Sequence, residues 1–226
     1  AEPDASRLGR VDVWPAGKVL GGGSAINGMV YLRGHRDDYD RWERAGAQGW
    51  SYADCLPYFL KCESNERLRD AWHGQRGPLH ISDVRADHPL NQMFIDACVA
   101  SGMKPNSDVN GAEQEGVGRM QTNQRGGMRD STARAYLEPA RARANLTVMT
   151  GAFAQRLRLA NGRAIGVEIV RNGTVLNLDA KKEVIVSTGS LSTPKLLMLS
   201  GIGPREELEK HGIACQIDLP GVGANL

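Results

Sequence analysis

The sequence predicts a mixed α/β protein that contains an antiparallel three-stranded β-meander. The pair Asn-Gly occurs twice, at Asn161-Gly162 and Asn172-Gly173, each time between segments of alternating apolar residues. Both central positions of a type I′ turn need a positive φ, which Asn and Gly tolerate, so two such turns in series predict three antiparallel strands. A third observation is the β-branched run EVIVSTG, which leads through glycine into an apolar helical pattern. That order is typical of a nucleotide-binding α/β sheet.

Length and composition are those of an ordinary globular protein. The chain has 226 residues, of which 41% are hydrophobic and 24% charged, and its formal net charge is +2. A charge this small does not indicate a nucleic-acid or membrane-surface patch. No apolar run reaches the ~18 residues that a transmembrane helix needs.

The first third of the chain predicts two short helices and a local aromatic core. Helical patterns cover residues 37–45 and 53–63, on either side of a turn at Gly46 and Gly49. Seven of the twelve aromatic residues fall between Tyr31 and Phe59. We expect these rings to pack against one another rather than against a ligand.

The middle of the chain alternates polar loops with short elements. Residues 64–90 are polar and irregular, and the run HGQRGPLHI predicts a turn into a short strand. Residues 91–101 predict a helix that Gly102 ends. Residues 105–130 read as a long polar loop, a feature that is usually functional or mobile. Ser131 is a suitable N-cap for a helix after it.

The last third predicts the meander, two more strands and two helices. A strand is expected at LTVMTG, residues 146–151, before the meander, and another at EVIVSTG, residues 183–189, after it. The run SLSTPKLLMLSG follows as a helix. A second helix is expected in PREELEKHG, with Pro204 at its start, acids early and Gly212 as its cap.

The cysteines and histidines predict no metal site. Cys55 and Cys62 are seven residues apart in a helical pattern, so they share one helix face. We expect them, with Cys98 and Cys215, to be buried structural residues without disulfides. The five histidines stand in no metal-binding spacing, and we expect each to be a surface or hydrogen-bonding residue.

Several catalytic and nucleotide-binding motifs are absent from the sequence. There is no G-x-G-x-x-G fingerprint and no G-x-S-x-G nucleophile elbow. The run AGKVLG contains Gly-Lys, but Val19 stands where a phosphate-binding loop needs Ser or Thr.

Two longer stretches resemble the signatures of the glucose-methanol-choline (GMC) flavin oxidoreductases. They are GKVLGGGSAINGMVYLRGHRDDYDRW, which starts at residue 17, and GSLSTPKLLMLSGIG, which starts at residue 189. The text between them is similar to the choline dehydrogenase-like branch, as in GWSYADCLPYFLKCES, WHGQRGPLHI and STARAYLEPA, so the resemblance covers essentially the whole chain. One departure is Ala16, where relatives commonly carry arginine.

The resemblance implies FAD as the cofactor and places the glycine-rich loop against it. Residues without Cβ let a backbone approach a flat ring and a diphosphate, and amide donors stabilise charge on the reduced ring. Beside the diphosphate and ribityl side the resemblance places Gly22, Gly23 and Ser24. Along the isoalloxazine edge it places Asn27, Gly28, Met29 and Val30. On the adenine and adenosine side it places Ala154, Thr188 and Gly189.

The activity that the resemblance implies is transfer of a hydride from a primary alcohol, choline-like or other, to flavin N5. Family members bind the FAD diphosphate with a G-x-G-x-x-G unit and use a later His–His or His–Asn pair as base. Neither is in this sequence, so we assign no catalytic residue and expect an internal piece of a larger enzyme. FAD should be non-covalent, because Ile26 stands where some relatives carry the linking histidine. The isolated chain should bind FAD weakly or not at all and be inactive.

The resemblance divides the chain into three segments. Residues 1–63 form the flavin-contacting loop and a helical subdomain, residues 64–144 form part of a substrate domain with the long loop, and residues 145–226 form the remainder of the FAD-binding domain. This is a partial FAD-binding domain of mixed α/β and α+β type. An exposed strand edge in the last segment is expected to promote self-association.

Other functions stay open at this point. One is a non-catalytic binding or assembly module derived from the same fold. A NAD-dependent dehydrogenase is disfavoured by the lack of a nicotinamide fingerprint. The expected partners are an alcohol and an electron acceptor, either oxygen or a quinone or dye, and not nucleic acid. A cytoplasmic location and a peripheral membrane location both stay open.

Overall fold

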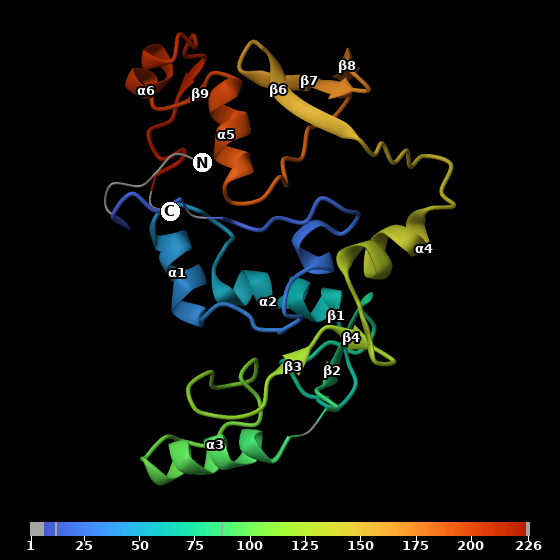
Figure 1. Cartoon of the computed structure of the whole chain (residues 1–226), viewed down its shortest axis with the longest axis vertical. Coiled ribbons are helices and arrows are strands. Elements are labelled where there is room, and N and C mark those ends of the chain that lie inside the picture. The colour runs from blue at the N-terminus through green and yellow to red at the C-terminus, as the bar shows by residue number, and fades with distance from the viewer. Residues whose placement is uncertain (1–6, 12, 87, 225–226) are drawn as a thin grey trace. The chain divides into compact units, whose positions relative to one another are not determined.

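The computed structural model describes residues 7–11, 13–86 and 88–224, and the chain divides into two compact units. Unit 1 is Ala1–Leu146 and unit 2 is Thr147–Leu226 (Figure 1). Each unit has its own helices and its own small sheets. The predicted mixed composition with an antiparallel three-stranded sheet is confirmed. None of the described helices has the length and apolar character that crossing a membrane requires.

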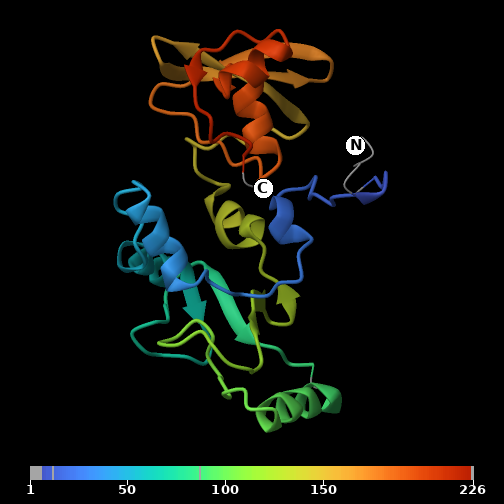
Figure 2. The ribbon, with the colours of Figure 1, turned by 90° about the vertical axis from the view of Figure 1, so that its left-hand side faces the viewer.

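The helices of unit 1 form where the sequence predicts them. They are α1 (Arg36–Arg44), α2 (Tyr52–Cys62) and α3 (Pro89–Ala100). Capping explains where they begin: Nδ1 of His35 accepts from the amide of Asp37, and the Asp38 carboxylate accepts from the His35 amide. Ser51 caps α2 through the amide of Asp54. The helices α1 and α2 contact each other, whereas α3 projects from the rest of unit 1 in both views (Figures 1 and 2).

The sheets of unit 1 are small. Strands β1 (Glu63–Asn65), β2 (Leu79–Asp83) and β3 (Gln121–Thr122) lie in the order β1-β2-β3, with β1 parallel and β3 antiparallel to β2. A two-stranded hairpin follows, formed by β4 (Gln124–Arg125) and β5 (Met128–Arg129). Ile81 on β2 is completely buried and marks the centre of this unit's core.

The aromatic residues of α1 and α2 form the packed local core that the sequence predicts. The ring of Tyr39 lies 5.2 Å from that of Trp42 and 5.6 Å from that of Phe59, both edge-on. Trp50 and Tyr52 complete the cluster. Trp42 and Trp50 stay about half exposed at the edge of this cluster, and the neighbouring Tyr58 is 68% exposed.

Unit 2 contains the meander. Its strands are β6 (Ala152–Ala160), β7 (Arg163–Arg171) and β8 (Thr174–Asp179), in the order β6-β7-β8 and antiparallel. All four residues of the two Asn-Gly turns have positive φ, between 51° and 79°, which confirms the turn prediction.

The other elements of unit 2 are short. Helix α5 (Ser192–Leu199) contacts β6, and Ser200 Oγ accepts a hydrogen bond from the amide of Leu157 at 2.7 Å. A parallel pair of two-residue strands, β9 (Ile202–Gly203) and β10 (Ile217–Asp218), flanks α6 (Arg205–Lys210). Pro204 is the N-cap of α6, and Gly212 after it has φ +69°. Both predicted helices of this region are therefore confirmed.

Two predictions of local structure were wrong. The described residues 146–151 and 183–189 form no strand, although their patterns predict one. A strand exists only where a neighbouring backbone pairs with it, and neither run joins a ladder among the described residues. Ile185 is accordingly 79% exposed. The helix predicted after Ser131 is present: Oγ of Ser131 accepts from the amide of Arg134 at 3.4 Å, and the chain continues as a π-helical segment, Ala133–Leu137, and α4 (Glu138–Ala140).

Candidate functional site

The glycine-rich loop folds as a short 3-10 helix, η2 (Gly22–Ala25), in unit 1. The chain enters this helix in the left-handed region, because Gly21 has φ +93° and Gly22 has φ +53°. An L side chain at either position would be strained. The loop's own backbone therefore explains the first two glycines of the run.

The third glycine has no such explanation within the chain. Gly23 does not have a positive φ, and a Cβ built on it would meet no atom within 4 Å. The same is true of Gly28. Gly17 is the opposite case, because a Cβ there would lie 2.1 Å from the carbonyl oxygen of Gly22. The backbone at Gly23 and Gly28 thus borders open space.

The hydroxyl of Ser24 holds the loop in place. It donates to the carbonyl of Gly21 at 2.6 Å and accepts from the amide of Thr132 at 2.9 Å. Arg129 adds two contacts, from Nη1 to the Ser24 carbonyl at 3.1 Å and to Oδ1 of Asn27 at 2.6 Å. The segment 129–132 therefore fixes the loop from one side, and the Ser24 hydroxyl already has protein partners.

The residues after the loop form an extended segment with an apolar surface. Met29 has φ +64°, a left-handed conformation that is costly for a residue other than glycine and is often found at functional sites. Its carbonyl accepts from the amide of Asn123, and Val30 pairs with Thr122. About half of the side-chain surface of Ile26 and of Val30 is exposed. A planar apolar ligand would cover such a surface.

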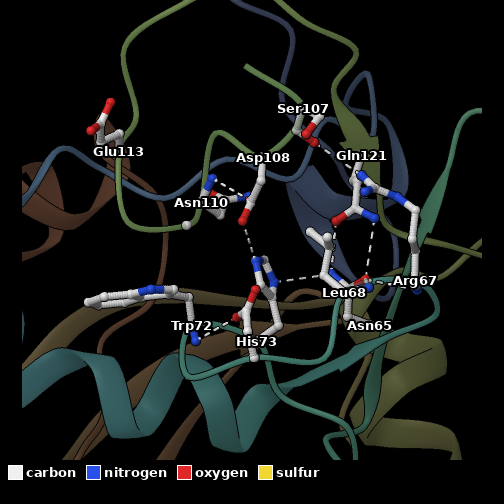
Figure 3. Close-up of polar contacts among 12 residues, drawn as sticks. Asn65, Arg67, Leu68, Trp72, His73, Ser107, Asp108, Asn110, Glu113 and Gln121 are labelled. Atoms are coloured by element: carbon white, nitrogen blue, oxygen red, sulfur yellow. Dashed lines mark hydrogen bonds and ion pairs between the residues drawn. The ribbon is translucent and has the colours of Figure 1, made fainter. Parts of the chain in front are cut away.

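The far end of this segment enters a buried polar network, and Figure 3 draws the part of it around His73, Asp108 and Asn110. Arg33 is 5% exposed and forms an ion pair with Glu63, which is 0% exposed. The amide of Arg33 donates to Oδ1 of Asn110 at 2.8 Å, and Nδ2 of Asn110 donates to the Tyr31 carbonyl at 3.0 Å. Asn110 and Glu63 thereby fix Tyr31 and Arg33, which directly follow Met29 and Val30.

His73 lies between two carboxylates in this network, as Figure 3 shows for Asp108. Its Nδ1 is 2.9 Å from Oε1 of Glu63, and its Nε2 is 3.0 Å from Oδ2 of Asp108. Burial lowers the pKa of His73, but the hydrogen bonds to Glu63 and Asp108 outweigh it and raise the pKa above the ordinary value. The favoured species is an imidazolium that donates from both nitrogens.

Glu63 shifts in the opposite direction. Burial raises the pKa of Glu63, yet hydrogen bonds from His73 and Asn65 and the charge of Arg33 outweigh it and lower the pKa below its ordinary value. The side-chain amide of Asn65, Nδ2, also donates to Oε1 of Gln121 at 2.8 Å. The network consequently joins β1 to β3, and β3 pairs with the extended segment after the loop.

One group of side chains in the described residues could approach a metal ion together. The ligand atoms of Asp70, His73 and Asp108 lie within 4.8 Å of one another. However, both nitrogens of His73 already have carboxylate partners, and Asp70 is exposed. The ion pair explains this arrangement without a metal, and the expectation of no metal site stays a prediction.

The remaining residues predicted to contact the cofactor lie in unit 2. Ala154 is on β6 and pairs with Ile169, next to a register shift in the ladder. Gly189 has φ +92°, and its carbonyl accepts from the amide of Thr193 at the start of α5. The hydroxyl of Thr188 is 3.1 Å from that of Thr193. The structure thus gathers the predicted residues from Gly22 to Val30 in one unit and these three in the other.

The cysteines differ from expectation in one respect. All four are free, but each is partly exposed rather than buried. Cys62 lies near Tyr136, where burial and a hydrogen bond with Cys62 raise the pKa of the phenol above its ordinary value. Cys55 and Cys62 thus lie on α2 as partly exposed residues.

Sequence reasoning missed the network around Glu63 and His73. His73, like the other four histidines, was expected to be a surface or hydrogen-bonding residue, and no role was predicted for Glu63, Asp108 or Asn110. Their partners are as much as 79 residues apart in the chain, as for Tyr31 and Asn110. One local signal was present, namely the high density of Asn, Asp and Gln in residues 105–130.

Comparison with known proteins adds a family match. The family model described as GMC oxidoreductase matches residues 5–226. The chain is 50% identical over all of its 226 residues to an oxygen-dependent choline dehydrogenase of Rhizobium johnstonii, and 46% identical to one of Brucella melitensis. The chain spans 41% of the length of each of these relatives.

Solved structures give the same picture. Pyridoxine 4-oxidase from Mesorbium loti has a TM-score of 0.89 and 35% identity, over 97% of this chain and 43% of that one. An FAD-dependent oxidoreductase from Chaetomium thermophilum has a TM-score of 0.90 and 33% identity, over 98% of this chain and 41% of that one.

Proposed function

Because the chain belongs to the GMC oxidoreductase family, we propose that it forms the flavin-contacting part of an FAD-dependent alcohol dehydrogenase or oxidase. The reaction is transfer of a hydride from a primary alcohol, choline-like or other, to flavin N5. The single observation that carries the proposal is the glycine-rich loop inside the family match. No contact with the described residues accounts for glycine at Gly23, whereas a cofactor that passes against the backbone would.

In this proposal the residues of the loop bind and orient the cofactor. Gly22, Gly23 and Ser24 border the diphosphate and ribityl side. The residues Asn27 to Val30 follow the isoalloxazine edge, and the exposed apolar side chain of Val30 excludes water there. Bound FAD supplies the hydride acceptor.

The same proposal gives unit 2 the adenosine end of the cofactor. Ala154 contacts the adenine through its backbone, and Thr188 and Gly189 border the ribose side. The left-handed φ of Gly189 supports this role, because glycine there lets the chain turn sharply into α5.

The structure also supports a positioning role for the buried network. We call residues 27–30 the flavin-edge segment. Just after it, Asn110 forms hydrogen bonds to the backbone of Tyr31 and Arg33, and the Arg33 side chain forms an ion pair with Glu63. A segment that is fixed in this way presents its amides to a cofactor without further ordering, which reduces the entropy cost of binding.

The proposal is tested on the intact flavoprotein. Purified protein should show the visible absorbance of flavin, and an alcohol should bleach this absorbance under anaerobic conditions. The name of the relatives makes dioxygen and choline the first acceptor and substrate to test. A protein that carries flavin but is not reduced by choline, benzyl alcohol or short aliphatic alcohols would contradict the activity. A protein without flavin would favour a binding or assembly module.

We further propose that the 226 residues alone oxidise no alcohol and bind FAD weakly or not at all, since they span 41% of their relatives. Exposed apolar residues such as Ile185 should promote self-association of the isolated chain. Dye reduction with excess FAD, together with size-exclusion chromatography, tests both points. Turnover above a blank without enzyme would contradict the first, and a sharp monomer peak the second.

A further inference from the structure

We propose that Arg129 is a positioning residue of the flavin site, because it sets the direction in which the side-chain amide of Asn27 points. This inference rests on the proposed function, since it takes the flavin-edge segment as the place where the isoalloxazine ring lies. It adds to the site a residue that lies 102 positions from Asn27 in the chain and to which the resemblance gives no role.

One nitrogen of the Arg129 guanidinium contacts the glycine-rich loop and the flavin-edge segment together. Nη1 donates to Oδ1 of Asn27 at 2.6 Å and to the carbonyl of Ser24 at 3.1 Å. A hydrogen bond from a charged donor is about twice as strong as one between neutral groups. The contact is therefore a strong constraint on the side chain of Asn27.

A second donor reaches the same oxygen of Asn27. The amide of Met29 donates to Oδ1 at 3.1 Å. Guanidinium groups and backbone amides can only donate, so the atom that both of them contact must be the carbonyl oxygen of the carboxamide and not its nitrogen. The nitrogen, Nδ2, consequently lies on the other branch of the planar carboxamide, where its two N–H groups are directed away from Arg129.

The same oxygen supports the unusual backbone of Met29. A left-handed φ of +64° is costly for methionine, and a hydrogen bond from its amide to Asn27 offsets part of this cost. Arg129 keeps the acceptor of this hydrogen bond in place. It thereby acts on the flavin-edge segment through the side chain of Asn27.

Arg129 is itself fixed by the residue that follows it. Asp130 is completely buried, and its Oδ2 accepts from the amide of His80 at 2.8 Å. The amide of Asp130 donates to the carbonyl of Asn123 at 2.9 Å, and Nδ2 of Asn123 donates to the carbonyl of Asp130 at 3.0 Å. The guanidinium of Arg129 therefore reaches Asn27 from an anchored backbone.

The exposed carboxamide of Asn27 has the chemistry that suits the edge of an isoalloxazine ring. The carbonyl oxygens and ring nitrogens of a flavin accept hydrogen bonds, and donors beside them stabilise negative charge on the reduced ring. With Arg129 in place, Nδ2 is presented as a donor and Oδ1, which would repel these acceptors, is kept away. Without Arg129, the carboxamide is free to rotate, so its ordering adds to the cost of binding.

The inference is tested by a double-mutant cycle on the intact flavoprotein, which is freed of FAD and then titrated with it. Asn27→Ala and Arg129→Met should each weaken FAD binding about tenfold, the usual loss for one good hydrogen bond. Because Arg129 acts through Asn27, the double variant should also lose about tenfold. A loss nearer to a hundredfold, the product of two independent effects, would overturn the inference.

The visible absorbance of the bound flavin is a readout that a purely structural role of Arg129 would not change. Removal of a donor at the ring edge shifts these bands, so Arg129→Met should shift them in the same direction as Asn27→Ala. The double variant should show no further shift. Unshifted bands in Arg129→Met would overturn the inference. Arg129→Gln, whose side chain is too short to reach Oδ1, takes the same test if Arg129→Met does not fold.

Arg85→Met is the matched control, because Arg85 is also in unit 1, is exposed and pairs with Glu66 at 3.1 Å. It should bind FAD and absorb light like the wild type. A wild-type protein that binds no FAD would contradict the proposed function and this inference with it. A wild type that binds FAD, with additive losses in the cycle, would leave the proposed function intact and overturn only the role of Arg129.

Discussion

Oε1 of Glu63 lies 2.9 Å from Nδ1 of His73, and neither side chain has any surface exposed to solvent. Oε2 of the same carboxylate pairs with the guanidinium of Arg33. One buried anion therefore has two buried cationic partners, and Asp108 supplies the second anion at Nε2 of His73. The network carries little net charge only as long as all four groups are present.

Replacing Glu63 tests how much this network stabilises unit 1. Glu63→Gln leaves the Arg33 guanidinium buried and without its carboxylate, which should lower the free energy of unfolding by about 3–5 kcal/mol. Urea denaturation followed by circular dichroism measures the change. Glu113→Gln is the control, because the pair of Glu113 with Lys104 is exposed and its loss should leave the midpoint unchanged. Equal midpoints for both variants would show that the buried network is not stabilising.

The two shifted pKa values make stability depend on pH in opposite directions. The pKa of His73 is raised on folding, so its contribution is complete below about pH 6.5, the unfolded value, and is lost as pH rises through the folded value. The pKa of Glu63 is lowered, so its contribution is complete above about pH 4.3 and is lost as pH falls through the folded value. Stability from this pair should be greatest between these limits.

A series of urea titrations across pH measures this profile for the wild type and for His73→Gln. The variant should lose the decline on the alkaline side, because no imidazole remains to be deprotonated there. An alkaline decline of unchanged size in the variant would show that another group causes it.

The linkage between protein and flavin follows from residue 26. Ile26 is half exposed on the loop and has no nucleophilic atom that could form a bond to the flavin ring. The FAD of the intact protein should therefore be non-covalent. Precipitation with acid should release all the flavin into the supernatant. Yellow colour that stays in the washed pellet would contradict this prediction.

Local signals predicted much of this fold, because they act over a few residues. Asn161 and Asn172 place both turns of the meander, since each precedes a glycine and adopts a positive φ. Pro204 and Gly212 mark the start and the end of α6 by the same kind of short-range chemistry. Features of this type depend on the chain's own neighbours and can be read without a structure.

Features that depend on distant partners were not predictable in the same way. The run that contains Ile185 has the pattern of a strand, but a strand also needs a paired neighbour. Glu63 pairs with Arg33, 30 residues away, and His73 pairs with Asp108, 35 residues away, so their roles depend on distant partners. For the candidate site, the resemblance identified the loop, but only the geometry distinguishes Gly23 from Gly21 and Gly22, whose φ values already require glycine.

The most direct test of the flavin site is the flavin content of Gly23→Val in the intact protein. A Cβ at Gly23 would meet no described protein atom within 4 Å and is not strained by a positive φ, so the variant should fold normally. Gly221→Val is the matched control, because Gly221 in unit 2 has the same open surroundings and no positive φ. We expect Gly23→Val to lose most of its flavin absorbance while its circular dichroism and unfolding midpoint match those of the control. A Gly23→Val variant with full flavin content and normal alcohol oxidation would contradict the site.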